Sequence, residues 1–209
     1  MIHFPLKISV LVSGNGSTLE FLLDAIRNEK LQSGEVRIPG IEICAVFSDR
    51  PCLAIEKAGI AGLPVQLFSR KTLGQDALDT LLAAALESCG CDLILLAGYL
   101  SVIGPQVLSG RPGKQGRIWN MHPSLLPRYG GMGMYGMHVH RAVLEAGEAT
   151  SGCTLHQVSA AVDRGAILAQ RAVDIRECRT AQEIAEKVQG LEKQLWLEYL
   201  QGFVSCQHE

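Results

Sequence analysis

The sequence predicts an α/β fold in a single domain: an open, mostly parallel, twisted sheet with helices on both faces and late strands that are partly antiparallel. Up to residue 121, apolar runs of strand length alternate with helical patterns. The links between them are short, and a series of this kind makes right-handed crossovers and parallel strands. Farther along, two strand-like runs follow one another across a short turn, which favours an antiparallel pair.

The expected parallel strands are strongly apolar. Residues 7–12 form a continuous apolar and β-rich run, which is typical of a strand that is covered on both faces. Further strands are expected over residues 41–47, 63–67, 92–96 and 117–121. Such continuous runs, rather than alternating ones, indicate a sheet that is buried between two layers of helices.

Helices are expected between these strands. The first begins near Ser17, which forms an S-x-x-E capping box with Glu20. Its apolar residues recur at i, i+3, i+4 and i+7, at positions Leu19, Leu22, Leu23 and Ile26. A short helix over residues 53–58 is expected to end at Gly59, and a third covers residues 75–88.

The pattern changes after the fifth expected strand. A glycine-rich loop over residues 130–136 leads to a helix over residues 138–146. Strands are then expected over residues 152–158 and 166–173. A last helix opens at Thr180, whose T-x-x-E sequence is a second capping box.

Composition narrows the classes of protein. The 209 residues are 47% hydrophobic and 19% charged, as in a packed globular protein, with enough chain for one sizeable core. A formal net charge of −2, without long basic runs, argues against a partner that is a nucleic acid, because such binding needs a basic face.

Several features favour the cytoplasm. The longest uncharged stretch, residues 93–105, is too short to span a bilayer, and the N-terminus lacks the regions of a signal peptide, so neither a membrane nor export is expected. No C-x-x-C motif occurs, and the irregular spacing of the cysteines indicates free thiols in a reducing compartment. They are Cys44, Cys52, Cys89, Cys91, Cys153, Cys178 and Cys206.

The loop SGNGST over residues 13–18 is a candidate anion site. It joins a buried strand to a helix N-terminus, where free backbone N–H groups and the helix dipole favour phosphate. Ser17 and Thr18 add hydroxyl donors. The loop matches neither a dinucleotide fingerprint nor a Walker A motif, and a tight turn without any ligand is the alternative interpretation.

Asn120 and His122 are candidate catalytic residues. They lie two apart on a strand and therefore project from the same face, at the carboxyl end where open α/β sheets bind ligands. A purely structural histidine is the alternative. Asp163, in the turn over residues 162–165, would favour the charged imidazole if it lay near His122, although carboxylates are also common in ordinary turns.

Metal ligation is not expected. His138 and His140 stand two apart on a predicted helix and do not face the same way, and no H-E-x-x-H motif is present. His122 and His156 are further histidines of this half of the chain. We therefore expect neither a metal cofactor nor a metal site.

Four motifs, in this order, resemble those of the phosphoribosylglycinamide formyltransferases, a family of folate-dependent enzymes of purine biosynthesis. They are SGNGS at residues 13–17, LAG at residues 96–98, NxHPSLLP at residues 120–127 and DxG at residues 163–165. The resemblance covers nearly the whole chain. It implies a Rossmann-like formyltransferase fold over residues 1–209, with an acceptor-phosphate half (1–110) and a folate-binding, catalytic half (111–209).

The resemblance also implies the reaction and its participants. A formyl group would pass from 10-formyltetrahydrofolate, a co-substrate, to the amine of glycinamide ribonucleotide. Small molecules would be the only partners, and the protein would be a monomer or a homodimer. Asn120 and His122 would stabilise the oxyanion of a tetrahedral intermediate, with His122 also shuttling protons, and Asp163 would orient His122.

Binding roles are implied in the same way. The acceptor phosphate would contact Gly16, Ser17 and Thr18, and its glycinamide end would contact Glu192. The folate would lie against Asn120 and the following residues: Arg70, Leu100, Ser101, Val102, Ile103, Ser159, Ala160, Ala161, Val162 and Asp163. Thr18 stands where the family commonly has Asn, Ser101 where it frequently has Arg, and the loop over residues 129–137 is longer than usual.

Three other functions are weighed against this one. Transfer to methionyl-tRNA would predict a further C-terminal domain and a basic surface, and formylfolate hydrolysis would predict an N-terminal regulatory domain. A nucleotide-binding module without catalysis would use Asp49, after the second expected strand, as a ribose ligand. It would bind NAD without any dependence on His122.

Overall fold

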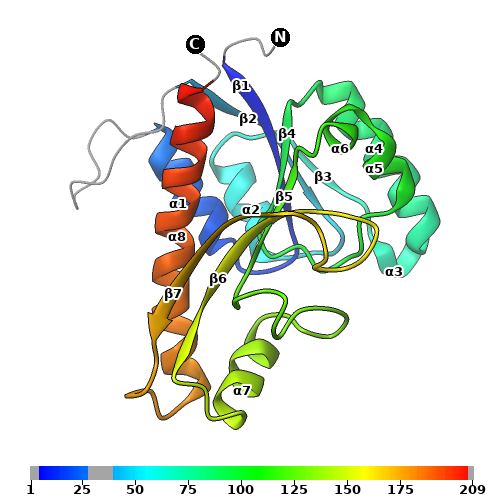
Figure 1. Ribbon diagram of the computed structural model, residues 1–209. Helices are drawn as coiled ribbons and strands as arrows, with labels where there is room; N and C mark the ends of the chain where they lie inside the picture. Colours follow the sequence, from blue (N-terminus) through cyan, green and yellow to red (C-terminus); the bar gives the residue numbers. More distant parts are fainter. Residues whose placement is uncertain (1–4, 28–39, 207–209) are drawn as a thin grey trace. The chain divides into compact units, whose positions relative to one another are not determined.

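The computed structural model describes residues 5–27 and 40–206 (Figure 1). Its hydrogen-bonded strand order is β3-β2-β1-β4-β5-β6-β7. The described residues cluster into two compact units. The first holds those up to Trp119 together with those from Leu200 onward, and the second is Asn120–Tyr199. The chain thus passes from the first unit to the second within β5 (Ile118–His122). The expected functional division at residue 110 stays a prediction.

Parallel pairing around β1 (Leu6–Val12) organises the first unit. This strand pairs in parallel with β2 (Ile41–Ser48) on one side and with β4 (Leu93–Leu96) on the other. Strand β3 (Val65–Leu67) adds to the outer edge of β2, also in parallel. Val10 and Leu11, neighbours in β1 that point to opposite faces, are both fully buried, as a strand between two layers of helices requires.

Helices of the first unit lie on both faces of its strands (Figure 1). Helices α1 (Ser17–Arg27) and α2 (Leu53–Ile60) cover one face, and α4 (Gln75–Cys89) covers the other. The remaining helices are short and lie before or after α4: α3 (Arg70–Leu73), α5 (Pro105–Ser109) and α6 (Arg111–Lys114). Periodicity did not predict these three because each spans only about one turn.

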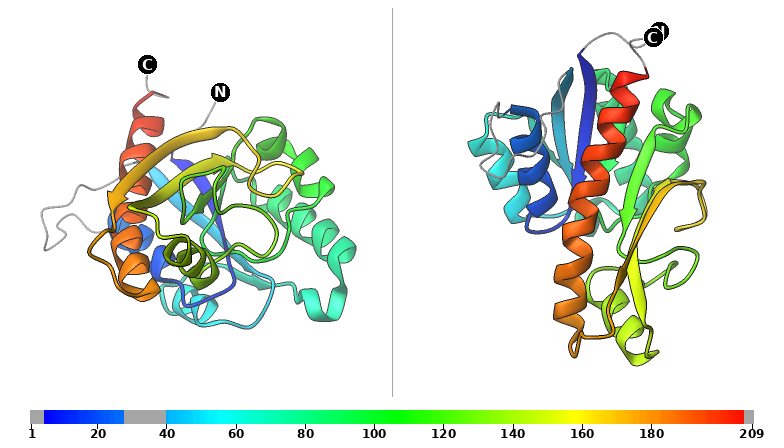
Figure 2. Two further views of the ribbon diagram at one scale, coloured as in Figure 1. Left: turned by 60° about the horizontal axis from the view of Figure 1, so that its bottom comes forward. Right: turned by 60° about the vertical axis from the view of Figure 1, so that its left-hand side comes forward.

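The second unit contains the antiparallel pair. Strands β6 (Thr150–Gln157) and β7 (Ile167–Asp174) pair antiparallel, with Thr150 opposite Asp174. Their ribbon lies between α7 (Met137–Glu145) and the first turns of α8 (Ala181–Ser205), as the two further views in Figure 2 show. The predicted fold class, mostly parallel with antiparallel late strands, is therefore confirmed.

One expected capping box is confirmed and the other is wrong. Thr180 and Glu183 form a reciprocal pair: the Glu183 N–H donates to Thr180 Oγ1 at 3.2 Å, and the Thr180 N–H donates to Glu183 Oε2 at 3.1 Å. At α1, the carbonyl of Gly16 accepts the first helical bond from the Glu20 N–H, so the cap is Gly16. The carboxylate of Glu20 binds Lys57 Nζ at 2.7 Å instead.

The expected end of α2 at Gly59 is also wrong. The helix continues to Ile60, and Gly62, with a φ of +73°, takes the left-handed conformation that follows a helix end. Gly59 lies inside the helix. A short apolar pattern could not show whether this glycine continued the helix or ended it. Within residues 5–27 and 40–206, no helix combines the length and the apolar character that a membrane crossing needs.

The two glycines at the end of α2 make a matched test of this assignment. Gly59→Ala should raise the free energy of unfolding by about 0.5–1 kcal/mol, because alanine is the better helix former and an added Cβ meets no atom within 4 Å. Gly62→Ala should lower it by about 1–2 kcal/mol, because its backbone is left-handed. Urea denaturation measures both free energies. A loss of stability in Gly59→Ala together with a gain in Gly62→Ala would indicate that the helix ends at Gly59.

Candidate active site

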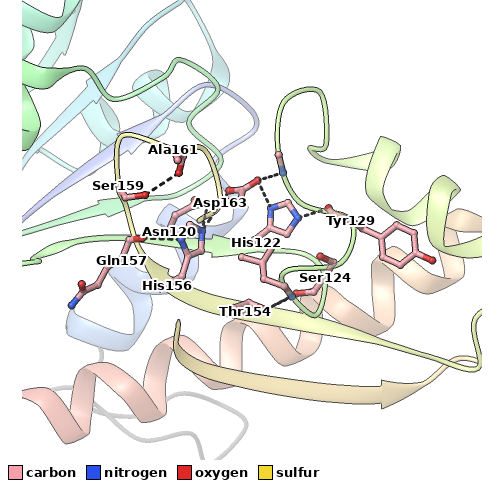
Figure 3. A network of polar contacts seen from close by, with 12 residues as sticks. Asn120, His122, Ser124, Tyr129, Thr154, His156, Gln157, Ser159, Ala161 and Asp163 are labelled. Carbon is pink, nitrogen blue, oxygen red and sulfur yellow. Dashed lines mark hydrogen bonds and ion pairs between the residues drawn. The ribbon is translucent and has the colours of Figure 1, made fainter. Parts of the chain in front are cut away.

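Asn120, His122 and Asp163 lie together in the second unit (Figure 3). Asn120 and His122 come from the end of β5, and Asp163 comes from the turn between β6 and β7. Asp163 Oδ2 lies 3.5 Å from His122 Nδ1. His122 is only 3% exposed, so the ring and the carboxylate face each other with little water between them. The structure therefore brings together the three residues that the sequence singled out for catalysis.

A second histidine, His156 on β6, joins this cluster. Its Nδ1 lies 2.9 Å from the carbonyl of Gln157, to which it can only donate. Burial lowers the pKa of His156 below its usual value; the Gln157 carbonyl and Asp163 oppose the shift, and His122 adds to it. The neutral ring then has a lone pair on Nε2, which accepts from Asn120 Nδ2 at 3.1 Å. His156 thereby fixes which way the Asn120 amide points.

Sequence reasoning considered His156 only as a metal ligand. Its neighbour Asn120 is far away in the chain, and only the adjacency of β5 and β6 brings the two together. The sequence placed His156 on an expected strand. Without the strand order, however, it could not show that this strand lies beside the one that carries Asn120. In the part of the chain that the structure describes, no three His, Cys, Asp or Glu side chains are placed to hold a metal ion.

Both sides of the His122 ring meet hydrogen-bond acceptors. Nε2 lies 2.8 Å from the carbonyl oxygen of Tyr129, and Nδ1 faces Asp163. The backbone N–H of Gly131 donates to the same Asp163 oxygen at 2.9 Å. The loop that follows the NxHPSLLP motif thus contacts both the imidazole and the carboxylate.

Thr154, fully buried on β6, holds the start of that loop. Its hydroxyl donates to the Ser124 carbonyl at 2.6 Å and accepts from the Leu126 N–H at 3.0 Å. Gln170 on β7 donates from Nε2 to the Leu126 carbonyl at 2.8 Å and to Thr154 Oγ1 at 2.9 Å. Buried polar groups that are satisfied in this way restrict the loop to one conformation.

The candidate anion loop lies in the first unit. Gly16, Ser17 and Thr18 stand together where β1 gives way to α1, with Ser17 exposed and Thr18 partly buried. A side chain at Gly16 would lie 2.9 Å from Ala54 of α2, and its φ of +78° also favours glycine. The loop is therefore a close-packed turn at a helix N-terminus, a geometry suited to an anion.

Asp49, at the end of β2, ties three loops of the first unit together. Ser13 Oγ donates to Asp49 Oδ1 at 2.6 Å, and Ser101 Oγ donates to Oδ2 at 2.5 Å. Ser13 Oγ also accepts from the Leu100 N–H at 2.9 Å, and Arg50 forms an ion pair with the carboxylate. Both oxygens are thus engaged by internal donors, which argues against Asp49 as a ribose ligand.

Burial raises the pKa of Asp49, but hydrogen bonds from Arg50, Ser101 and Ser13 together lower it further, so the net pKa lies below its usual value. The carboxylate is accordingly ionised at neutral pH. A buried charge of this kind is tolerated only because every oxygen has donors.

The other expected binding residues occupy varied surroundings. In the segment after β4, Leu100 and Val102 are exposed whereas Ser101 and Ile103 are buried. Arg70 opens α3 with an exposed side chain, and its N–H donates to the Asp49 carbonyl at 3.0 Å.

In the second unit, the segment between β6 and β7 exposes Ala160 and Ala161, and Ser159 Oγ donates to the Ala161 carbonyl at 2.9 Å. Val162 is partly buried beside Asp163. Glu192 lies on α8, where burial raises its pKa to about 7, with Lys193 opposing the shift. The roles of all these residues stay predictions.

Comparisons with known proteins identify the family of this chain. The family model described as formyl transferase matches residues 6–200. The chain is 38% identical over 194 residues to the chloroplastic phosphoribosylglycinamide formyltransferase of Arabidopsis thaliana, covering 92% of this chain and 63% of the relative. It is 40% identical over 174 residues to the trifunctional purine biosynthetic protein adenosine-3 of Drosophila melanogaster, covering 81% of this chain and 12% of that protein. This chain thus spans less than two thirds of these relatives' lengths.

Solved structures are similar over more of their length. Glycinamide ribonucleotide transformylase 1 of Symbiobacterium toebii has a TM-score of 0.81 and 32% identity, over 96% of this chain and 88% of its own. Phosphoribosylglycinamide formyltransferase of Brucella melitensis has a TM-score of 0.78 and 36% identity, over 94% of each chain. The resemblance expected from the four motifs is confirmed.

The Asp49 cluster generates a prediction about stability and pH. The folded-state pKa of Asp49 is lowered, so its contribution is complete above the unfolded pKa of about 3.9 and is lost as the pH falls through the folded value. Asp49→Asn should therefore lower the free energy of unfolding by about 2 kcal/mol at pH 7. The difference from the unaltered protein should shrink below about pH 4.

Asp174→Asn is the matched control. Asp174 also has a lowered pKa, of about 2, through its hydrogen bonds with Arg176, but this pair is exposed and its electrostatic contribution is screened by solvent. Urea denaturation across pH should therefore show little change for this variant. An equal and pH-independent effect of both substitutions would contradict the role given to Asp49.

Proposed function

Because the chain belongs to the formyl transferase family, we propose that it transfers the formyl group of 10-formyltetrahydrofolate to the amine of glycinamide ribonucleotide, a step of purine biosynthesis. The observation that carries the proposal is the cluster of an amide, an imidazole and a carboxylate. Asp163 lies 3.5 Å from His122, and His156 lies 3.1 Å from Asn120 and 3.6 Å from Asp163. The names of the similar enzymes support the choice of acceptor.

The chemistry of the reaction fits these side chains. Attack of the acceptor amine on the formyl carbon produces a tetrahedral intermediate whose oxygen is negatively charged. Asn120 keeps one Nδ2–H free of His156 for this oxyanion, because each amide nitrogen has two hydrogens. The positive charge of a protonated His122 would stabilise the same oxyanion electrostatically. Preorganised donors of this kind are each worth roughly 10²–10³ in rate.

Proton transfer completes the mechanism. The attacking amine must lose a proton, and the folate N10 must gain one when the carbon–nitrogen bond breaks. His122 is the group that can do both, and Asp163, 3.5 Å from Nδ1, stabilises the charged ring between the two transfers. This route uses neither a metal ion nor a covalent intermediate with the protein.

We assign the expected substrate contacts separately for the two units. In the first unit, Gly16, Ser17 and Thr18 would hold the acceptor phosphate, while Leu100, Val102 and their buried neighbours would contact the folate, with Arg70 near its glutamate tail. In the second unit, the backbone over residues 159–163 would contact the pterin, and Glu192 would contact the glycinamide. Arg70 is exposed, which is compatible with a flexible, anionic ligand end.

Free thiols at all seven cysteines support a reducing, cytoplasmic location, which we propose together with a monomeric or homodimeric state. Transfer to methionyl-tRNA or to water would use the same three residues and differ only in the acceptor. The assay below distinguishes these functions because each acceptor is added separately.

The first test is a transformylation assay with glycinamide ribonucleotide and 10-formyltetrahydrofolate in a metal-free buffer, followed by folate absorbance. His122→Ala should lower kcat by at least about 10²-fold, because the positive charge and the proton shuttle are lost together. Its fold, followed by circular dichroism, should be unchanged. Near-normal turnover would exclude the mechanism, and turnover with water or methionyl-tRNA alone would reassign the acceptor.

The Asp163→Asn variant distinguishes a role in orienting His122 from a role in binding the acceptor. It should lower kcat far more than it raises the acceptor KM, because the carboxylate faces the His122 ring. An equal change in both constants would make Asp163 a ligand for the acceptor.

Glu192 gives a prediction that depends on pH. Its pKa of about 7 means that the carboxylate, which can accept hydrogen bonds from the glycinamide, forms as the pH rises through this value. The acceptor KM of the unaltered protein should therefore fall between about pH 6 and 8. Glu192→Gln should abolish this dependence and raise KM about tenfold at pH 8, a loss of about 1.4 kcal/mol in binding.

The pH dependence of the unfolding temperature tests the pKa of Glu192 without any substrate. When the folded-state pKa of a carboxyl group is raised, the group's contribution to stability is fully present below its unfolded pKa. This contribution is lost as the pH rises through the folded-state pKa. Glu192→Gln should thus unfold at a higher temperature than the unaltered protein at pH 8, and the two should converge near pH 4. A constant difference would contradict the raised pKa.

A further inference from the structure

Glu148, which follows α7, binds two consecutive side chains of the loop after β5. Arg128 donates to Glu148 Oε2 from Nη1 at 3.2 Å, and its Nη2 pairs with Oε1. The hydroxyl of Tyr129 donates to the same Oε1 at 2.7 Å. The guanidinium carbon of Arg128 also lies 5.5 Å from the centre of the Tyr129 ring. One carboxylate, 18% exposed, thus anchors two neighbouring residues.

The backbone of this anchored pair faces the catalytic histidine. The Tyr129 carbonyl lies 2.8 Å from His122 Nε2, and the Arg128 carbonyl accepts from Ser124 Oγ at 2.6 Å. Tyr129 has a φ of +55°, a left-handed conformation that a tyrosine adopts only when its surroundings impose it. The Glu148 contacts are the side-chain interactions that hold Tyr129 in this conformation.

A carbonyl oxygen at Nε2 determines where His122 keeps its proton. Both neighbours of the ring can only accept, but the carbonyl lies 2.8 Å from Nε2 whereas the carboxylate oxygen lies 3.5 Å from Nδ1, so the neutral ring keeps its single hydrogen on Nε2, at the closer contact. The proton that comes and goes must then be the one on Nδ1, which faces Asp163. Without the Tyr129 carbonyl, the neutral ring could place its hydrogen on Nδ1 beside the carboxylate and leave Nε2 bare.

We propose that Glu148 is a positioning residue for His122: through Arg128 and Tyr129 it keeps the Tyr129 carbonyl on Nε2, so that the reaction exchanges its proton at Nδ1. This role rests on the proposed function for its effect on turnover. The contact itself, from Glu148 to the imidazole, belongs to the free protein and can be measured without substrates.

Nitrogen NMR of protein labelled with ¹⁵N-histidine reports the position of the proton on each ring. In the unaltered protein, the neutral form of His122, assigned by its loss in His122→Gln, should be the Nε2–H form. In Glu148→Gln, which removes the charge but keeps the size, the Nδ1–H form should appear in a substantial fraction. A spectrum that keeps the Nε2–H form alone in Glu148→Gln overturns the proposal.

Kinetics measures the consequence for the reaction. Glu148→Gln should lower kcat by about 10-fold to 100-fold with both KM values within about twofold, because a misplaced catalytic group costs rate rather than binding. Tyr129→Phe, which removes one of the three hydrogen bonds to Glu148, should give a smaller loss in the same direction. The double variant should lose no more than Glu148→Gln does, because both act through the same carbonyl.

Glu198→Gln is the matched control. Glu198 on α8 forms an exposed ion pair with Arg171 of β7 at 2.5 Å and has no contact with the loop after β5 among the described interactions. It should leave both kcat and the His122 spectrum unchanged. A fall in kcat for Glu148→Gln that Glu198→Gln reproduces would overturn the positioning role.

The spectrum also separates this proposal from the proposed function. Suppose that the unaltered protein does not transfer formyl groups, but that the His122 tautomer differs between it and Glu148→Gln. This result would refute the proposed function and support the positioning contact. If Glu148→Gln unfolds near room temperature, Arg128→Met removes the same ion pair from the exposed side and takes its place in both measurements. Unchanged tautomer and kcat in that variant, together with Tyr129→Phe, would overturn the proposal.

Discussion

The carboxylate of Asp163, whose side chain is 10% exposed, is the point on which the polar contacts of the candidate active site converge. Its Oδ2 lies 3.5 Å from His122 and accepts from the Gly131 N–H at 2.9 Å, while its Oδ1 lies 3.6 Å from His156. Removing a carboxylate from water is costly unless its oxygens find donors. The Gly131 N–H and the charged form of His122 are the donors that meet this requirement, and they join the loop after β5 and the end of β5 to one group.

The two histidines beside Asp163 have different neighbours, and this difference gives them different parts. His156 donates to the Gln157 carbonyl and, with its pKa lowered by burial, stays neutral and accepts from Asn120. His122 has an acceptor on each side, a carbonyl and a carboxylate, which suits a ring that takes up and releases a proton. Neighbouring histidines with different hydrogen-bond partners can therefore take different roles in acid–base catalysis.

A buried carboxylate also organises the first unit. Asp49 joins the loops after β1, β2 and β4 through Ser13, Arg50 and Ser101. Ser101, which stands where the resembling family frequently has Arg, fits this position because its hydroxyl donates to Asp49 at 2.5 Å. The loop after β1, proposed to hold the acceptor phosphate, depends on the same contacts for its conformation.

The sequence by itself determined the strands and the longer helices, and it predicted the kind of chemistry that the site would perform. Continuous apolar runs predicted β1 and its parallel neighbours, and alternation along β5 placed Asn120 and His122 on one face, because both patterns are local. The tertiary structure decided the ends of α1 and α2, the partnership of His156 with Asn120, and the chain of contacts from Glu148 through the Tyr129 carbonyl to His122. These features depend on strand order and loop conformation, which join residues distant in the chain and leave no periodic trace in it.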